Sequence, residues 1–324
     1  MPAAARRPMT DLRPNAAPGN PSGHRPLIRL VVNADDFGIS DRINAGILQA
    51  HREGIVTATS LMAAGRAFEH AVQVSRTTPS LDVGVHLTLV AETPLLRRKS
   101  SLVGGEGRFP ASAGAFTCRW LTGSVRRTDV AAEWSAQIER VLENGIRVSH
   151  LDSHQHVHVL PGLFDLTWEL AARYGIPFVR VPVEDLRAGG PPSLHRINRM
   201  LGSTVLRVLW MIGRPAKTGP ARCRSLRFLG FQDGGRLDVK RLRQLLGRLH
   251  PGGVHELMCH PGFPPDEPDI RDWQYSHAEE LQALTHPSIR SEIAARGIRL
   301  CNFKDLTQSN LSRDEKIVAD PNRG

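Results

Sequence analysis

The chain has 324 residues, with 42 Lys and Arg against 32 Asp and Glu, so its formal net charge is +10. Its 40% hydrophobic and 23% charged residues are typical of a globular protein with a substantial core in one large or two ordinary domains. It lacks an unbroken apolar stretch long enough to cross a bilayer. Its four cysteines are too scattered for a disulfide framework, which favours free, buried thiols in a reducing compartment.

Residues 1–26 predict a disordered N-terminal tail, because they contain basic residues but no continuous apolar stretch of a secretory signal. Residues 27–306 are expected to form one α/β domain, and residues 307–324 a flexible C-terminal tail. The missing export signal favours the cytoplasm and leaves peripheral attachment to a membrane open.

Within residues 27–306, short β-branched or apolar runs alternate with longer stretches at helical spacing, which predicts a mainly parallel α/β sheet. Strands are expected at 28–34, 57–64, 82–89, 148–154, 178–182, 255–261 and 298–303. Helices are expected at 41–53, 67–77, 127–144, 161–174 and 276–296, the last broken at Pro287. Seven strands without a GxGxxG turn after the first favour a closed or nearly closed (β/α) barrel over an open Rossmann sheet.

Two segments rich in Gly, Pro and Arg interrupt this alternation, at 92–126 and 186–236, and such insertions usually shape a substrate mouth. The second accounts for the basic charge, because residues 187–248 hold fourteen Lys and Arg and two acids, a net of +12. Within 193–214, apolar residues recur at helical spacing among four arginines; they are Leu194, Ile197, Leu201, Val205, Val208 and Ile212. This pattern suits an anionic lipid surface or a phosphorylated substrate, and the alternative is a solvated arginine-rich face over ordinary core contacts.

Two adjacent carboxylates, Asp35 and Asp36, directly follow the first expected strand, where α/β barrels place catalytic groups. Like charges so close resist joint ionisation unless a cation or a hydrogen-bond donor compensates. The pair therefore suggests a metal, and a helix N-cap followed by a turn is the ordinary alternative.

Histidines mark the next two motifs. His86 lies inside the third expected strand, where a hydrogen-bonded core histidine is the ordinary alternative. In HLDSHQHVH, the residues Asp152, His154, His156 and His158 alternate with others, so they line one side if the strand continues that far. Because neutral imidazole is the commonest metal ligand, the cluster predicts a metal site in which some members bind the ion and others orient ligands or bind substrate.

His260 lies at the end of a further expected strand, and Arg180 lies on another. His260 ends an apolar run before a Pro-Gly turn, where it could equally cap the strand. Arg180 lies in FVRVP, and a buried arginine there would pair with a carboxylate such as Asp35, although pairing at the surface is equally compatible with the sequence.

Together, these carboxylates and histidines indicate a mononuclear metal hydrolase. One aspartate and two histidines leave coordination positions open for water and substrate. A free carboxylate can then remove the proton of the water, and a further histidine can protonate the leaving group.

The motifs NADDFGIS, GVHLTL, HLDSHQHVH and MCHPGFP, in this order along the domain, resemble those of the YdjC/ChbG-like carbohydrate deacetylases, with the hopanoid-biosynthesis deacetylases as close relatives. The resemblance implies an α/β barrel related to polysaccharide deacetylases. It also implies a divalent-metal hydrolase that removes acetyl from an N-acetylated amino sugar, in an oligosaccharide or a glycolipid, and leaves acetate and a free amine.

Carried over motif by motif, the resemblance makes Asp35 the general base and Asp36, His86 and His154 the metal ligands. His260 becomes the general acid or the stabiliser of the tetrahedral intermediate. The family's metal is usually magnesium, whereas an Asp-His-His set suits zinc at least as well on ligand chemistry. We therefore expect one divalent cation and favour Mg²⁺ over Zn²⁺.

Arg180, His156 and Asp152 are expected to bind substrate or to orient the ligands. The basic region 187–248 departs from the compact family pattern and leaves the substrate open, because a neutral chitooligosaccharide gains little from it. A contact with anionic lipid or with a phosphate on the substrate would use this charge. No nucleic-acid partner is expected, and a homodimer is compatible with the sequence.

Three rival functions are compatible with parts of the pattern. Two histidines and one carboxylate also describe iron(II) oxygenases, although those sites are usually built on antiparallel β folds. A peripheral membrane or nucleic-acid binding protein would use the basic charge, but aromatic residues make up only 5% of the chain and provide no stacking platform. A barrel that binds sugar without catalysis is disfavoured by the intact motifs.

Overall fold

The computed structural model describes residues 26–97, 99–184, 194–213, 224–271, 273 and 275–308, with the backbone alone at 194–200. The predicted N-terminal tail, apart from Pro26, lies outside the described residues. The last helix, α11 (Phe303–Gln308), covers the first two residues of the predicted C-terminal tail, and the rest of that tail is also outside the described residues.

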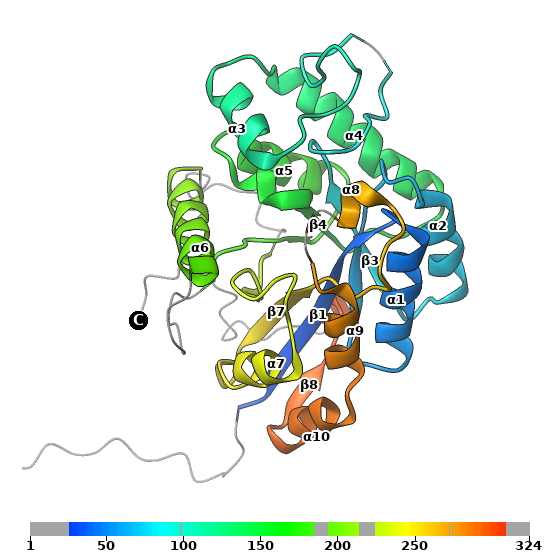
Figure 1. Cartoon of the computed structure of the whole chain (residues 1–324), viewed down its shortest axis with the longest axis vertical. Helices are drawn as coiled ribbons and strands as arrows, with labels where there is room; N and C mark the ends of the chain where they lie inside the picture. The colour runs from blue at the N-terminus through cyan, green and yellow to red at the C-terminus, as the bar shows by residue number, and fades with distance from the viewer. Residues whose placement is uncertain are drawn as a thin grey trace, which may run out of the picture.

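A single parallel sheet of eight strands forms the centre of the molecule (Figure 1). Its strand order is β5-β4-β3-β2-β1-β7-β6, and β8 pairs with the first residues of β1. A parallel bridge from Phe178 in β5 to Arg224, just before β6, joins the two ends of this order. The strands are β1 (Ile28–Phe37), β2 (Ala58–Leu61), β3 (Asp82–Leu87), β4 (His150–Ser153), β5 (Phe178–Val179), β6 (Arg227–Leu229), β7 (Val254–Cys259) and β8 (Ile298–Leu300). The predicted α/β barrel is confirmed.

The strand assignment differs from the prediction at two places that matter for the site. Strand β1 extends to Phe37, so Asp35 and Asp36 lie inside the strand and not behind it. Strand β6 was not predicted, because its three residues stand inside the expected insertion 186–236. Since β6 pairs with β7, the C-terminal part of that insertion belongs to the barrel sheet.

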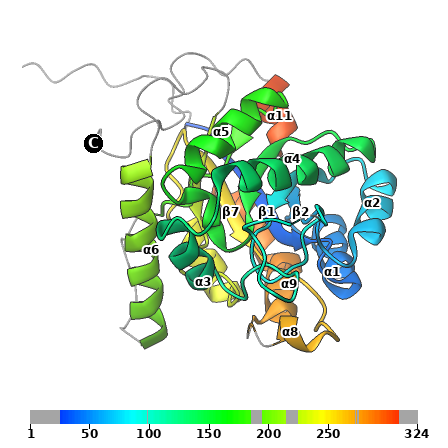
Figure 2. The same ribbon diagram turned by 90° about the horizontal axis from the view of Figure 1, so that it is seen from above.

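Helices surround the sheet (Figure 2). They are α1 (Asp41–Arg52), α2 (Phe68–Thr77), α3 (Ala113–Leu121), α4 (Arg127–Glu143), α5 (Leu163–Arg173), α6 (Leu194–Gly213), α7 (Val239–Leu246), α8 (Pro268–Arg271), α9 (His277–Thr285), α10 (Pro287–Ala295) and α11. The Ser40 side chain caps α1 by accepting from the Arg42 N–H, and the expected break at Pro287 separates α9 from α10 because proline can begin a helix but not continue one. In the described part, no helix combines the length and the apolar character needed to cross a membrane.

The strand face that carries the site changes from apolar to polar along the barrel axis. Near the amino ends of the strands, a buried apolar layer consists of Val31, Ala58, Phe178, Leu226, Val254, Cys301, Phe303 and Leu306. Because side chains alternate along a strand, the residues two positions later share the same face, and there they are the buried polar groups Asn33, Ser60, Arg180 and Glu256. The carboxyl end of the barrel is therefore polar inside.

Two of the described cysteines, Cys259 and Cys301, are buried free thiols, as the sequence predicts. Cys118 is free but exposed on α3. The expectation of burial is wrong for this residue, because α3 lies on the outside of the barrel (Figure 2).

Candidate metal centre and active site

Strand β1 ends with an irregular step that turns two neighbouring carboxylates toward one cavity. Its register with β2 shifts between Ala34 and Phe37, and Asp36 has a left-handed backbone with φ of 67°. Asp35 and Asp36 consequently line the same cavity of about 270 Å³, although neighbours on a regular strand point to opposite faces. A left-handed non-glycine residue costs about 1–3 kcal/mol, which the surrounding fold must supply.

The HLDSHQHVH motif does not continue as a strand. Strand β4 ends at Ser153 and the chain enters the irregular 3₁₀ turn η1 (His154–Val159), in which Gln155 and His156 have φ of 53° and 56°. The Ser153 hydroxyl accepts a hydrogen bond from the backbone N–H of His158 at 3.0 Å and thereby closes the turn. The expectation that Asp152, His154, His156 and His158 line one side of a strand is therefore wrong, because the turn gives each side chain different neighbours.

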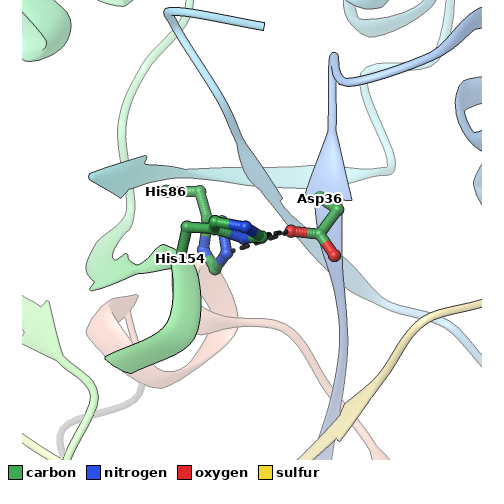
Figure 3. A group of neighbouring side chains, drawn as sticks. All are labelled: Asp36, His86 and His154. Atoms are coloured by element: carbon green, nitrogen blue, oxygen red, sulfur yellow. Dashed lines mark hydrogen bonds and ion pairs between the residues drawn. The ribbon is translucent and has the colours of Figure 1, made fainter. Parts of the chain in front are cut away.

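Three predicted ligands meet at one point, as Figure 3 shows. The Asp36 Oδ1 atom lies 2.9 Å from His154 Nδ1 and 3.3 Å from His86 Nε2. All three side chains are buried and come from β1, β3 and η1. One carboxylate and two imidazoles within bonding reach of a common point form a donor set that suits a divalent transition metal and can also hold magnesium.

Asp152 holds the His86 ring in place. The Nδ1 atom of His86 lies 2.7 Å from Asp152 Oδ1, while Nε2 faces Asp36. A carboxylate behind a histidine in this way fixes the tautomer and the ring orientation of a metal ligand and raises its basicity. Ser60 in turn donates to the other Asp152 oxygen at 2.7 Å, so the position of the carboxylate is fixed as well.

The electrostatics of this cluster favour a cation. Burial raises the pKa of Asp36, but the charges and hydrogen bonds of His154 and His86 outweigh burial and hold this pKa well below its usual range. Burial lowers the pKa of His86, but the charge and hydrogen bond of Asp152 and the hydrogen bond of Asp36 raise it to about 10. The carboxylates therefore stabilise positive charge at the very position where the imidazoles present their nitrogen atoms.

Arg180 is buried in the barrel and joins three carboxylates. Its guanidinium donates to both oxygens of Asp35, at 2.6 and 2.7 Å, and to Glu256 at 2.7 Å. It also lies 2.8 Å from Asp152 Oδ2. The predicted pairing of a buried Arg180 with Asp35 is confirmed, and Asp35 receives a further hydrogen bond of 2.8 Å from the Asn33 side chain.

A second group of possible donors, Asp35, His86 and Asp152, also lies close together. Its two carboxylates already pair with Arg180. A cation there would face a fixed guanidinium at close range, and like charges at such distances repel strongly in a buried site. The group that contains Asp36 and His154 is therefore the better metal site.

His260 lies near the second carboxylate oxygen of Asp36. Its Nε2 atom is 4.0 Å from Asp36 Oδ2, and its Nδ1 atom is buried without a hydrogen-bond partner. Its backbone N–H donates to Glu280 at 2.6 Å, which fixes the end of β7. Burial lowers the pKa of His260 to about 4 in spite of Asp36 and Asp35, so its ring is a neutral imidazole at neutral pH.

His156 also lines the cavity, but it does not belong to the group of three predicted ligands. Its ring lies 5.5 Å from that of Phe231, and its Nδ1 atom is buried without a partner. Burial, with the charges of Arg180 and His158, holds the pKa of His156 well below its usual value. By contrast, His158 faces the protein, with Nδ1 at 2.6 Å from Ser153 Oγ and Nε2 at 3.0 Å from the Arg180 carbonyl.

Several cavity residues were not predicted. They are Gln155, Phe231, Met258 and Tyr275, and Trp273 lies with its ring 5.1 Å from that of His154. Met258 could have been found, because it alternates with His260 along β7. The aromatic residues stand in irregular segments, where no periodic pattern indicates which way a side chain points.

The family model described as YdjC-like protein matches residues 29–295. A carbohydrate deacetylase from Geobacillus stearothermophilus is 34% identical over 85% of this chain and 97% of its own length, and one from Homo sapiens is 35% identical over 87% and 92%. The crystal structure of a proposed cellobiose-phosphate cleavage protein from Enterococcus faecalis is similar with a TM-score of 0.66 and 27% identity, covering 86% of this chain and 99% of that one. The chain therefore belongs to the YdjC-like family of carbohydrate deacetylases.

Proposed function

We propose that this protein is a metal-dependent hydrolase that removes the acetyl group from an N-acetylated amino sugar in an oligosaccharide or a glycolipid. The observation that carries the proposal is the placement of His86, which Asp152 holds from behind while its Nε2 atom faces Asp36 beside His154. The substrate class is supported by relatives named carbohydrate deacetylase and, in Salmonella paratyphi B, chitooligosaccharide deacetylase, the latter 32% identical over 86% of this chain.

In this proposal Asp36, His86 and His154 hold one divalent cation, and we favour Mg²⁺ over Zn²⁺. When bound, such a cation lowers the pKa of a water molecule toward neutrality and polarises the amide carbonyl. The three side chains are preorganised for it, because two of them come from barrel strands and all are buried.

Asp35 is the proposed general base. It lines the same cavity as the three ligands, and Arg180 and Asn33 hold its carboxylate in one orientation. A carboxylate fixed in this way can accept the proton of the attacking water without reorganisation, and such proton transfer typically contributes about 10²–10⁴ in rate. Arg180 is then the residue that positions the base.

His260 is proposed to act at the leaving nitrogen. Its ring lines the cavity and its Nδ1 atom has no partner in the protein. As a neutral imidazole it can pass on to the departing amine the proton that Asp35 has taken from water, or donate a hydrogen bond to the developing negative charge. His156, on another wall of the cavity, is proposed to contact the sugar.

The proposal can be tested by acetate release from acetylated amino sugars, with the protein loaded with Mg²⁺ or Zn²⁺ and with EDTA as a control. Asp35→Asn should lose about 10²–10⁴ in kcat and keep its metal content, whereas His86→Ala and His154→Ala should lose bound metal. His70→Ala is the matched control, because His70 also pairs with an aspartate, Asp41 at 2.8 Å, but at the exposed surface.

Two results would contradict these assignments. Full turnover by Asp35→Asn would remove it as the base, and unchanged metal content in both histidine variants would place the cation elsewhere. Acetate release under strictly anaerobic conditions would separate the hydrolase from an iron oxygenase, which needs oxygen.

A further inference from the structure

Helix α6 presents an apolar face to solvent. Nine large hydrophobic side chains are exposed in the described part of the chain, and five of them stand on this one helix. These five, which we call the α6 face, are Leu201, Val205, Val208, Met211 and Ile212, with exposed fractions between 47% and 68%. Their spacing of three or four residues places them in one stripe along the helix.

The opposite side of the helix packs on the protein. Ser203 and Trp210 are buried, and the helix lies against α5 and η1 at the edge of the molecule (Figures 1 and 2). The alternative expectation, an arginine-rich face over core contacts of the apolar row, is therefore wrong for residues 201–212. Leu201, Val205, Val208 and Ile212 are exposed on this helix and are not its core contacts.

The sequence around the α6 face is basic throughout. Residues 186–232 contain nine Lys and Arg and no acidic residue. Among the described ones, Arg207 flanks the α6 face on the same helix and Arg227 is exposed on β6. An exposed apolar stripe in a cationic segment without acids is the combination by which amphipathic helices bind anionic lipid surfaces, with apolar side chains buried near the headgroups.

The inner side of α6 packs against a residue that lines the catalytic cavity. A Cβ atom at Gly202 would lie 3.2 Å from the ring of Phe231, so the helix backbone closely approaches that ring. Phe231 lines the cavity together with Asp36, His154 and His260. Any surface that binds α6 therefore lies close to the cavity wall that Phe231 forms.

We propose that the α6 face docks on an anionic lipid bilayer and that the enzyme acts on an acetylated amino sugar whose apolar anchor stays in that bilayer. The second half rests on the proposed function, while the docking itself does not. A second copy of this chain is the less favourable occupant, because packing two α6 faces together would bring two cationic segments into contact. Anionic lipid headgroups neutralise the same charges.

The test is sedimentation of the full chain with phosphatidylcholine vesicles that contain or lack phosphatidylglycerol, at low and high salt. We expect binding to the anionic vesicles at low salt and its loss at high salt, because surface charges are screened. The affinity of the variant Val205→Asp/Val208→Asp for the anionic vesicles should fall by about tenfold or more. Each change removes an apolar group and adds a negative charge, which the anionic lipids repel. Leu121→Asp is the matched control, because Leu121 is 65% exposed on α3, and it should bind like the wild type.

Each outcome decides the docking. Equal binding of neutral and anionic vesicles, or no binding at low salt, overturns it. A concentration-dependent dimer of the wild type that Val205→Asp/Val208→Asp abolishes, without vesicle binding, assigns the face to a second copy instead. Circular dichroism shows whether the double variant is folded, and the single variant Val208→Lys, which keeps the positive sign, tests the apolar contribution if it is not.

The activity of the wild type separates the two proposals. Acetate release from soluble and from vesicle-anchored acetylated amino sugars is measured on the same preparation. Preference for the anchored substrate that disappears in the double variant supports both proposals. Vesicle binding without acetate release from any substrate leaves the docking standing and refutes the proposed function, whereas turnover of soluble substrate without vesicle binding does the reverse.

Discussion

The barrel interior and the outer side of α6 depart from the usual arrangement of side chains in opposite directions. The interior buries Arg180 with Asp35, Asp152 and Glu256, while α6 exposes a row of apolar side chains. Charges are rarely buried unless they are paired, and large exposed apolar patches usually mark a surface that binds something. The buried charges of the barrel are neutralised by partners within the protein, whereas the exposed apolar row of α6 faces the surroundings of the protein.

Compensation in the interior is extensive. The Arg180 guanidinium meets three carboxylates, and Asp152 continues the network to His86 and Ser60. Removing one member of such a network leaves the others buried and unpaired, which costs more than the pair contributes. Substitutions inside the barrel should therefore have large effects on stability, and substitutions on the α6 face small ones.

The largest effect is expected for Arg180→Met, which leaves three buried carboxylates without their counter-charge. The free energy of unfolding in urea should fall by about 3–5 kcal/mol. Arg127→Met is the control, because Arg127 pairs with Glu169 at 2.7 Å with both side chains exposed, and its loss should be below about 1 kcal/mol. Similar losses in the two variants would show that the interior network does not depend on Arg180.

The next effect concerns the link from this network to the proposed metal site. Asp152→Asn keeps an oxygen near His86 but removes the negative charge behind the ring, and metal affinity should fall about 10–100-fold, measured by titration with Mg²⁺ or Zn²⁺. Asp41→Asn makes the same change behind the exposed His70 and should leave the affinity unchanged. Equal affinities of wild type and Asp152→Asn would mean that the charge of this carboxylate does not tune the site.

A carboxylate on α4 that holds the first insertion extends the comparison to the periphery. Asp129 on α4 accepts hydrogen bonds from the Ser101 hydroxyl and backbone at 2.7 and 2.8 Å. The hydrogen bonds from Ser101, together with that of Arg126, outweigh burial, which raises the pKa, and lower the pKa of Asp129 to about 2 from 3.8. Since the pKa is depressed in the folded state, the stabilisation is present above about pH 4 and is lost as the pH falls through about 2.

Asp129→Asn should accordingly be less stable than the wild type by about 2 kcal/mol or less at neutral pH. The difference in the free energy of unfolding should shrink as the pH is lowered from 4 to 2. It is measured by urea unfolding of both proteins at several pH values in that range. Asp266→Asn, at an 86% exposed side chain, serves as a reference with little expected change. A difference that stays constant down to pH 2 would mean that Asp129 is not the group that titrates.

Much of the site follows from sequence patterns, and the rest depends on local backbone geometry. The strand ends that carry His86, Arg180 and His260 are predictable because apolar runs alternate with helical stretches. The irregular step that directs both Asp35 and Asp36 toward one cavity is not predictable from the sequence. It rests on the left-handed backbone of Asp36, which is neither glycine nor asparagine. The same limit applies to η1, where two left-handed residues end the expected strand after Ser153.

The network around Arg180 shows a second limit. Glu256 alternates with Met258 and His260 along β7, so its side of the strand is readable from the sequence. Its partner is not, because β5 and β7 are not neighbours in the sheet and meet only through the curvature of the barrel. Periodicity predicts which side chains share a face, and only the closure of the sheet decides which faces meet.

The α6 face marks a third limit and the smallest expected effect on stability. Helical spacing indicates that Leu201, Val205, Val208 and Ile212 share one side of the helix, but it does not indicate whether that side faces the core. Because Val208 is 47% exposed, Val208→Asp should change the free energy of unfolding by less than about 0.5 kcal/mol, whereas Trp210→Ala on the buried side should cost about 3–5 kcal/mol. A large loss of the free energy of unfolding in Val208→Asp would mean that this side of the helix is covered within the folded chain. The barrel interior and α6 would then be two buried regions that differ only in polarity.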